Sequence, residues 1–374
     1  MLETTLGRLA CPGLTSPCDG RLNLEIEHSS FLSACKHEDV ASGSLICREC
    51  GACYPIIAGI AIVVADWKEY VLSRWEFISK LPRERIPAFV ASVIEDTENQ
   101  GKRYAPQQEW ESDDILNAYL LNHFMCYSLN EFDDLKEIFT APRIFDLIAE
   151  NWPQTSPFQM KRWLEASPPC QDFLELGCSV GGTVTLLPDL LKGSYLGIDL
   201  SMRSIAVARK LLLETDAESD GLLPHGKCLD TEMWIDPGMR EKIAGMDVDF
   251  IVGSAWQPPV SYGAWSFVSA ANILDFSSDP QSFAIMQNAL LTKEGRCFLT
   301  APISPFSPIA NKMGSGSPDG DLTNKLISLY RRAGFELLDR RDDLPWIIPR
   351  GPRYIEYFSV DAFLFAKHSE FGSS

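Results

Sequence analysis

The chain has 374 residues, of which 45% are hydrophobic and 22% are charged. This length favours two domains, and the composition is typical of a globular protein with a sizeable core. Because the net charge is −18, the chain repels a polyanion overall, so we expect a small-molecule or protein substrate and no nucleic acid. No apolar run approaches the roughly 20 residues that cross a bilayer, and the first residues lack a secretory signal. We therefore expect no membrane partner and a cytoplasmic location.

Cysteines are concentrated at the start of the chain. Six of the eleven lie in the first 53 residues, namely Cys11, Cys18, Cys35, Cys47, Cys50 and Cys53. Without an export signal, such a cluster indicates metal binding before disulfides. Cys47 and Cys50 have the spacing that lets two thiolates converge on one ion, and Cys11 and Cys18 supply a second pair. We predict a structural zinc site of these four residues, in a ribbon domain of residues 1–66; the alternative is a ribbon that folds without metal.

The segment Tyr54-Pro-Ile-Ile-Ala-Gly-Ile60 follows these cysteines. It resembles the Tyr-Pro-Ile…Gly-Ile segment of the small zinc-ribbon proteins that activate tRNA and release-factor methyltransferases. The same module is found fused ahead of small-molecule methyltransferases. The first knuckle departs from that family, because it is Cys-x6-Cys rather than Cys-x-x-Cys. Cys35, His37 or Cys53 therefore stay open as alternatives for one zinc ligand.

Residues 67–167 have mostly helical periodicity, and we expect a helical connector that forms a lid. Ser112 precedes two aspartates and an apolar face at helical spacing, which predicts a helix start. Ser156 places a cap residue before a proline, which predicts another. His123 lies on a predicted helix of this segment, where it either contacts substrate or is a buried or capping histidine.

From residue 168 to residue 374, apolar strands alternate with amphipathic helices, which predicts a parallel sheet. The predicted strands are Phe173–Gly177, Tyr195–Asp199, Val248–Gly253, Ser266–Ala270, Arg296–Thr300, Glu336–Leu338 and Val360–Ala366. The predicted helices are Thr183–Leu191, Ser201–Leu213, Pro280–Leu291 and Leu322–Ala333. We expect a surface insertion at residues 215–246 and a loop at residues 302–320. The predicted fold class is α/β, with a Rossmann-like sheet of seven strands.

A glycine-bearing turn follows the first of these strands. Gly177 and Gly181 permit backbone conformations that a side chain would block, so a ligand can lie across the turn at the carboxyl end of the strand. Glu175 lies near this turn and can accept a hydrogen bond from a ligand ammonium. Asp199 closes the next strand, where its carboxylate can accept both hydroxyls of a ribose. These features also fit a nicotinamide enzyme.

Two segments indicate more specifically which cofactor this turn binds. Glu175-Leu-Gly-Cys-Ser-Val-Gly181 and Gly197-Ile-Asp-Leu-Ser201 resemble the first two motifs of class I S-adenosylmethionine-dependent methyltransferases. The resemblance implies that Glu175, Gly177 and Gly181 contact the methionine part of the cofactor. It also implies that Asp199 binds the ribose, with Leu200 beside it.

Two later segments extend this resemblance. Val252-Gly-Ser-Ala255 resembles the third-strand motif, which implies cofactor contacts for Ser254 and Ala255, although Ser254 replaces the usual aspartate. Ala270-Ala-Asn-Ile-Leu-Asp275 resembles the fourth motif, which implies that Asn272 lies beside the cofactor and Asp275 near the substrate.

The last third of the chain carries a more particular segment. Asp343-Leu-Pro-Trp-Ile-Ile-Pro-Arg-Gly-Pro-Arg-Tyr354 resembles the methyltransferase domain of ovothiol synthases, which methylates the imidazole of 4-mercaptohistidine. The resemblance spans roughly Phe173 to Lys367 and does not include the sulfur-inserting domains of those proteins. It implies N-methylation of a thiohistidine-like or other imidazole substrate.

An amino-acid substrate needs a cation for its carboxylate, and Arg350 and Arg353 are candidates for that role. Asp275 is a candidate for holding an ammonium or an imidazole N–H, and Tyr354 for orienting the ring. Trp346 is a candidate wall of the pocket. The structural alternatives are exposed arginines on a loop, core aromatic residues and a helix-capping aspartate. Methylation of oxygen, carbon or sulfur in another metabolite stays open, as do a non-catalytic interaction module and the oligomeric state.

Overall fold

The computed structural model describes residues 1–13, 18–32, 37–99, 109–128, 139, 141–213, 222–223, 235–303 and 322–368. The chain divides into two compact units. Unit 1 comprises Met1–Ser128, Cys178–Thr185 and Leu196–Ser261, and unit 2 comprises Leu129–Gly177, Leu186–Tyr195 and Tyr262–Ser374. Among the described residues, no helix combines the length and the apolar character needed to span a membrane.

The chain alternates strands and helices after an N-terminal run of strands. The strands are β1 (Leu22–Leu32), β2 (His37–Cys47), β3 (Cys53–Ile57), β4 (Ile60–Val63), β5 (Phe173–Leu176), β6 (Ser194–Asp199), β7 (Asp247–Gly253), β8 (Trp265–Ala271), β9 (Leu291–Ala301), β10 (Phe335–Gly351) and β11 (Tyr354–Lys367). The α-helices are α1 (Trp67–Leu72), α2 (Trp75–Ile78), α3 (Ala88–Asn99), α4 (Asp113–Ser128), α6 (Pro142–Asn151), α7 (Ser156–Glu165), α8 (Met202–Leu213), α10 (Pro237–Ala244), α11 (Pro280–Leu290) and α13 (Leu322–Arg332). Short 3-10 helices include η3 (Glu109–Glu111), η5 (Gly182–Leu186) and η8 (Leu274–Phe276).

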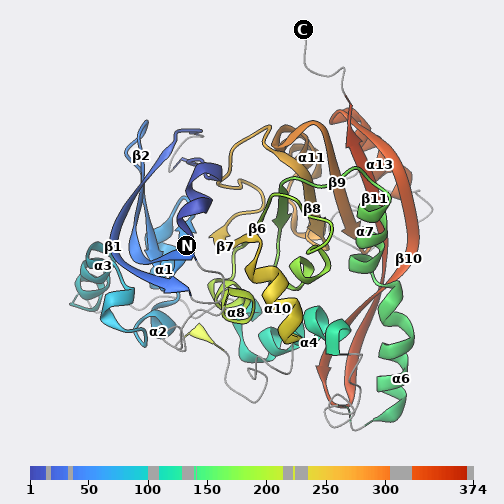
Figure 1. The fold of residues 1–374 in the computed structure, drawn as a ribbon, viewed down its shortest axis with the longest axis horizontal. Coiled ribbons are helices and arrows are strands. Elements are labelled where there is room, and N and C mark those ends of the chain that lie inside the picture. The colour runs from blue at the N-terminus through green and yellow to red at the C-terminus, as the bar shows by residue number, and fades with distance from the viewer. Residues whose placement is uncertain are drawn as a thin grey trace. The chain divides into compact units, whose positions relative to one another are not determined.

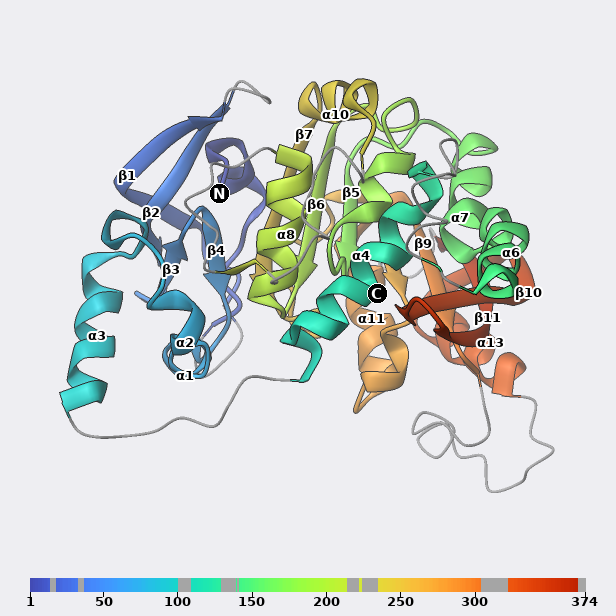
Figure 2. The same cartoon turned by 90° about the horizontal axis from the view of Figure 1, so that it is seen from below.

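In unit 1, the N-terminal strands join the α/β strands. The strand order there is β1-β2-β3-β4-β7-β6. The first four strands are antiparallel to one another, whereas β4 and β7 are parallel, with Ile62 opposite Val252. Figure 2 shows α8 running beside β4 and β7. Eleven strands are described in all, so the predicted sheet of seven is not confirmed. No local sequence pattern indicates that β4 pairs with β7.

A buried ion cluster ties three elements of unit 1 together. Arg209 in α8 pairs with Asp39 in β2 at 2.6 Å and with Asp249 in β7. All three side chains are buried. Removing one member of such a cluster leaves an uncompensated charge, which typically costs about 3–5 kcal/mol.

In unit 2, the strand order is β5-β8-β9-β11-β10, as Figure 1 shows for its orange to red strands. β5, β8 and β9 are parallel, whereas β9, β11 and β10 are antiparallel. The core includes Phe173, whose ring stacks on those of Tyr195 and Phe267 with centroids 5.6 and 5.0 Å apart. β10 and β11 are far longer than predicted and form one hairpin from Phe335 to Lys367.

One predicted helix is wrong. Residues 183–191 form only η5 and a turn, rather than an α-helix. Thr183, Val184 and Thr185 are β-branched, and Pro188 lacks the N–H that a helix interior requires. The helices predicted from Ser201, Pro280 and Leu322 match α8, α11 and α13 within two residues.

The expected insertion at residues 215–246 contains α10, which Asp236 caps through the N–H groups of Gly238 and Met239. Most of its remaining residues, and most of the expected loop at residues 302–320, lie outside the described part of the chain.

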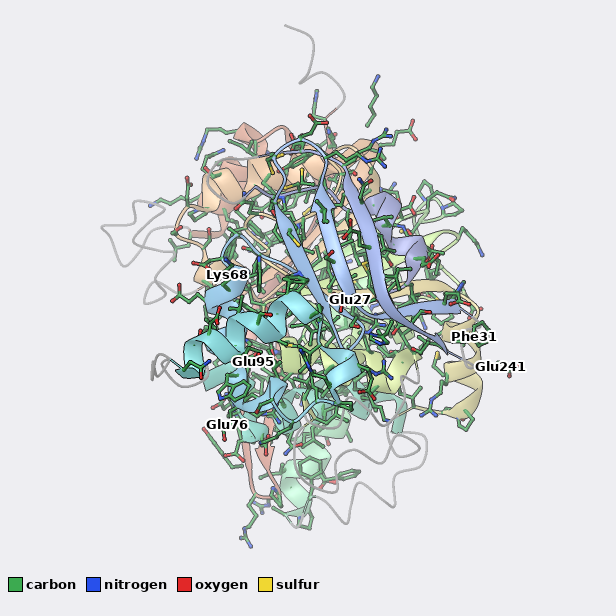
Figure 3. The ribbon with its side chains drawn as sticks, turned by 90° about the vertical axis from the view of Figure 1, so that its left-hand side faces the viewer. Glu27, Phe31, Lys68, Glu76, Glu95 and Glu241 are labelled. Carbon is green, nitrogen blue, oxygen red and sulfur yellow. The ribbon has the colours of Figure 1, made fainter. Side chains whose placement is uncertain are left out.

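Several acidic side chains of unit 1 are exposed to solvent. Glu27, Glu76, Glu95 and Glu241 are exposed and extend outward in Figure 3. This surface agrees with the strongly negative net charge of the chain.

Candidate functional site

The turn after β6 holds the carboxylate of Asp199 in a defined orientation. The backbone N–H of Ser179 donates to one oxygen at 2.9 Å, and that of Ser201 donates to the other at 2.8 Å. Burial raises the pKa of Asp199, and the hydrogen bonds from Ser201, Ser179 and Leu200 oppose that rise. Because an ionised carboxylate has about four acceptor positions, this carboxylate can accept further hydrogen bonds from ligand hydroxyls.

The loop before this turn has three residues in the left-handed region. Gly177, Ser179 and Gly181 have φ angles of 75°, 48° and 79°. In unit 1, a Cβ on Gly181 would lie 2.6 Å from the ring of Phe250, so only glycine fits there. In unit 2, a Cβ on Gly177 would lie 2.6 Å from Ile273. Both predicted glycines are therefore required by backbone conformation and by close packing.

Residues ahead of the α/β strands contact the Asp199 turn, and sequence reasoning missed them. The Tyr70 hydroxyl donates to the Leu200 carbonyl at 2.6 Å. The Glu111 carboxylate accepts from the N–H of Met202 at 2.8 Å and pairs with Arg74 at 2.9 Å. The helix start predicted from Ser112 matches α4, whereas the start predicted from Ser156 is one residue late, because Thr155 is the N-cap residue of α7. No local sequence pattern reveals the distant partners Tyr70 and Glu111 of the Asp199 turn.

His123 lies against the glycine loop. Its Nδ1 accepts a hydrogen bond of 3.2 Å from the N–H of Gly182. Burial lowers the pKa of His123 to about 4, so the ring is neutral at neutral pH. The His123 side chain is half-buried and is held by this hydrogen bond from the loop, and contact with substrate stays a hypothesis.

The turn after β7 carries Ser254 and Ala255. The Ser254 hydroxyl accepts from the N–H of Trp256 at 3.2 Å. Further along, the N–H of Ala10 donates to the Pro259 carbonyl at 3.1 Å, so this loop is bound to the segment that carries the first cysteine.

In unit 2, Glu175 is buried in β5 and accepts a hydrogen bond from the Tyr195 hydroxyl. The Glu175 carboxylate therefore already has one protein partner, and its expected contact with a ligand ammonium stays a proposal.

The end of β8 places Asn272 and Asp275 close together in the chain. Asn272 has a φ of 55°, and its side-chain oxygen accepts from the Thr300 hydroxyl at 2.8 Å. Asp275 lies in η8 and is partly buried, with one carboxylate oxygen that has no hydrogen-bond partner among the described residues. Burial raises its pKa to about 6. A carboxylate in this condition is a candidate for contact with a ligand.

The remaining predicted substrate residues lie in the β10–β11 hairpin rather than on a loop between shorter strands, with Arg350, Arg353 and Tyr354 at its tip. Arg350 pairs with Glu356 at 2.9 Å, and Tyr354 donates to the same carboxylate at 3.2 Å. Arg353 and Tyr354 are exposed. Trp346 contacts Phe358, with ring centroids 4.9 Å apart.

The four predicted zinc ligands lie together in unit 1. The sulfur atoms of Cys11, Cys18, Cys47 and Cys50 are all within 4.8 Å of one another. The Cys11–Cys50 and Cys18–Cys47 sulfur distances are 3.6 and 3.7 Å, close to the about 3.8 Å edge of a tetrahedral zinc–thiolate site. Burial raises the pKa of Cys47, but N–H groups of Cys50 and Glu49 donate to its sulfur and lower the pKa to about 7.

Of the alternative ligands, His37 and Cys53 do not belong to this group of four. Cys35 lies outside the described residues.

Comparison with known proteins identifies the N-terminal segment. Residues 9–59 match the family of Trm112p-like proteins, in agreement with the ribbon resemblance. None of the curated proteins matches the chain.

Three solved structures that this chain resembles weakly follow, and two of them are described as methyltransferases. YcgJ from Bacillus subtilis is 13% identical with a TM-score of 0.37, over 57% of this chain and 98% of that chain. The N-methyltransferase NodS from Bradyrhizobium japonicum WM9, in complex with S-adenosyl-L-homocysteine, is 13% identical with a TM-score of 0.35, over 57% and 88%. A TehB-like SAM-dependent methyltransferase from Corynebacterium glutamicum is 15% identical with a TM-score of 0.34, over 61% and 100%. Sequence identities and TM-scores this low do not assign a function to this chain.

Proposed function

We propose that this chain is an S-adenosylmethionine-dependent methyltransferase acting on a small molecule. The observation that carries this proposal is the Asp199 carboxylate, which the N–H groups of Ser179 and Ser201 hold at the end of β6. Its free acceptor positions suit the two hydroxyls of a ribose. Ser254 and Ala255 follow β7, the strand next to β6, and complete the unit 1 residues assigned to the adenosine part.

The assignment of Glu175, Gly177 and Asn272 to the same cofactor rests on their sequence motifs. When bound, S-adenosylmethionine supplies a methyl group on an already activated sulfonium. The chain's own residues then need to bind, align the acceptor and exclude water rather than activate a leaving group. Few catalytic side chains are required for such a reaction.

For the acceptor, we favour the imidazole nitrogen of a thiohistidine-like amino acid, on the resemblance of the hairpin segment to ovothiol synthases. Asp275 would accept a hydrogen bond from the substrate ammonium or imidazole N–H. Arg350 and Arg353 would bind the carboxylate, and Tyr354 would orient the ring. A neutral imidazole needs orientation more than deprotonation, since its parent pKa is about 6.5.

Calorimetry with S-adenosylmethionine and S-adenosyl-L-homocysteine tests the cofactor assignment directly. We expect dissociation constants in the micromolar range and one site per chain. A methyl-transfer screen over histidine, thiohistidines and related amines, read by mass spectrometry, then tests the acceptor. Absence of cofactor binding would favour a non-catalytic interaction module, for which the serine at position 254 is the supporting feature. Transfer to oxygen, carbon or sulfur of another metabolite would refute the imidazole assignment alone.

We also propose that the four-cysteine group binds structural zinc, since all four tetrahedral positions are then filled by protein. Purified protein should contain about one zinc per chain. The double variant Cys47→Ser, Cys50→Ser should lose it, with a thermal midpoint lower by at least about 5 °C. Cys53→Ser is the matched control, because Cys53 is outside the group. Metal-free protein of unchanged stability would refute the zinc site.

A further inference from the structure

Two turns of unit 1 that we assign to the cofactor are held by residues from the segment ahead of the α/β strands. We infer that Tyr70, Arg74, Glu111 and His123, called the brace below, position these turns for cofactor binding, an inference that rests on the proposed function. The brace gives the helical segment after the ribbon a positioning role in the cofactor site, which differs from the lid expected from its sequence.

The first part of the brace acts through a single peptide group. The Tyr70 hydroxyl donates to the carbonyl of Leu200 at 2.6 Å. The N–H at the other end of the same peptide belongs to Ser201 and donates to Asp199 at 2.8 Å. Because a peptide group is planar and rigid, fixing its carbonyl also fixes the direction of its N–H. Tyr70 therefore orients the hydrogen bond that holds the ribose-binding carboxylate.

Tyr70 is itself held in place. The Arg74 guanidinium lies over its ring, 3.6 Å from the centroid, which is the geometry of a cation–π contact. Arg74 also pairs with Glu111 at 2.9 Å, and both side chains are buried. Glu111 accepts from the N–H of Met202 at 2.8 Å, so the next peptide of the turn is held as well. A carboxylate at this position also suits the N-terminus of α8.

The second part of the brace acts on the glycine loop. The N–H of Gly182 donates to Nδ1 of His123 in α4. A Cβ on Gly182 would lie 2.8 Å from the His123 carbonyl oxygen, so the backbone of α4 lies directly against the loop. The two parts come from separate helices and hold separate turns. Each part keeps its turn ordered before a ligand binds, which lowers the entropy cost of binding.

Tyr70→Phe removes only the hydroxyl and tests the first part. We expect the dissociation constant of S-adenosyl-L-homocysteine to rise about 5-fold, the usual effect of one hydrogen bond. The KM for S-adenosylmethionine should rise by a similar factor, while kcat at saturation and the KM for the acceptor stay unchanged. Tyr357→Phe, at an exposed tyrosine of β11, is the matched control and should leave all of these values unchanged.

His123→Phe and His123→Asn test the second part. Phenylalanine keeps a ring but removes the acceptor for the Gly182 N–H, so cofactor affinity should fall about 5-fold or more. Asparagine offers an oxygen close to the position of Nδ1 and should restore most of the affinity. A purely structural role of the ring would give the reverse order. Binding is measured well below the thermal midpoint of each variant, so that all are folded.

The outcomes separate this inference from the proposed function. If the unmodified protein does not bind S-adenosyl-L-homocysteine, the proposed function fails. If it binds, but Tyr70→Phe and His123→Phe bind equally well, the function stands and the brace is refuted.

Discussion

Asp199 is the last residue of β6, and Asp275 follows β8; the surroundings of these two aspartates differ. Burial raises the pKa of both. Asp199 receives backbone N–H groups from Ser179 and Ser201, which oppose that rise. Asp275 has one oxygen without a hydrogen-bond partner among the described residues, and its pKa rises to about 6 because of burial alone.

The difference separates two ways of preparing a carboxylate for a ligand. Asp199 is held by the protein's own backbone before any ligand arrives, which suits accurate binding of neutral hydroxyls. Burial of the ionised Asp275 carboxylate costs free energy that no described group offsets. A cationic ligand, or one with an N–H group, would lower this cost by hydrogen bonding to the carboxylate. We therefore expect cofactor binding to depend on Asp199 and acceptor binding to depend on Asp275.

The largest expected effect is that of Asp199→Ala. Removing a charged acceptor of two ribose hydroxyls should weaken S-adenosyl-L-homocysteine binding by at least about 100-fold, since hydrogen bonds to charged groups contribute about 1.5–3 kcal/mol each. Calorimetry measures the loss, and Glu241→Ala, at an exposed acid of α10, is the control. Unchanged affinity would remove the central assignment of Asp199.

A smaller effect, on a different quantity, is expected from Asp275→Asn. The value of kcat/KM for the acceptor should fall about 10- to 100-fold, because the variant keeps the shape but loses the charge that favours an ammonium or N–H. Affinity for S-adenosyl-L-homocysteine should stay within about 2-fold, because no charge is assigned to Asp275 in cofactor binding. An equal loss of both quantities would erase the distinction between the two aspartates.

Asp199 was predictable from sequence, because an apolar strand ending in an acid is a local pattern. Gly177 and Gly181 were predictable for the same reason, and their positive φ angles agree. Tyr70 and Glu111 were not, since they contact residues 130 and 91 positions away. Such contacts depend on tertiary packing, which periodicity does not encode.

The hairpin shows the same limit on a larger scale. Its closing segment was recognised by resemblance, but the two predicted strands were short and left Pro345 and Pro349 in the loop between them. Both prolines lie in β10, which is the last strand in the order of unit 2 and tolerates missing N–H donors on its outer side. The pairing of Arg350 with Glu356 follows from that hairpin register and could not be read from spacing alone.

A still smaller effect is expected at the hairpin, where the arginines would bind the substrate carboxylate. Arg353 is exposed, so Arg353→Ala should raise the acceptor KM about 3- to 10-fold. Arg350 is partly neutralised by Glu356, so Arg350→Ala should have the weaker effect of the two. Steady-state kinetics at saturating S-adenosylmethionine measures both values. If both variants have normal kinetics, the carboxylate of the substrate is bound elsewhere, and only the contact assigned to Asp275 remains.

The smallest effect is a gain in stability from Asp275→Asn. The folded-state pKa of about 6 lies above the ordinary value of 3.8, so the folded protein binds more protons than the unfolded chain between these values. Stability of the unmodified protein therefore falls as the pH rises through this range, and the full penalty is present above pH 6. Asparagine does not titrate, so the thermal midpoint of the variant should be higher by about 1–3 °C at about pH 8, after allowance for solvent screening of a partly exposed group. The difference should shrink at about pH 4.5, where Asp275 is largely protonated.

Asp199→Asn is the control and should give no such gain in stability. The two oxygens of the Asp199 carboxylate each accept a hydrogen bond from a backbone N–H group, whereas an amide has one acceptor oxygen and can accept from only one of these groups. Equal midpoints for Asp275→Asn and the unmodified protein at both pH values would mean that the Asp275 carboxylate is not strained by burial, and its assignment to the acceptor would lose its physical basis.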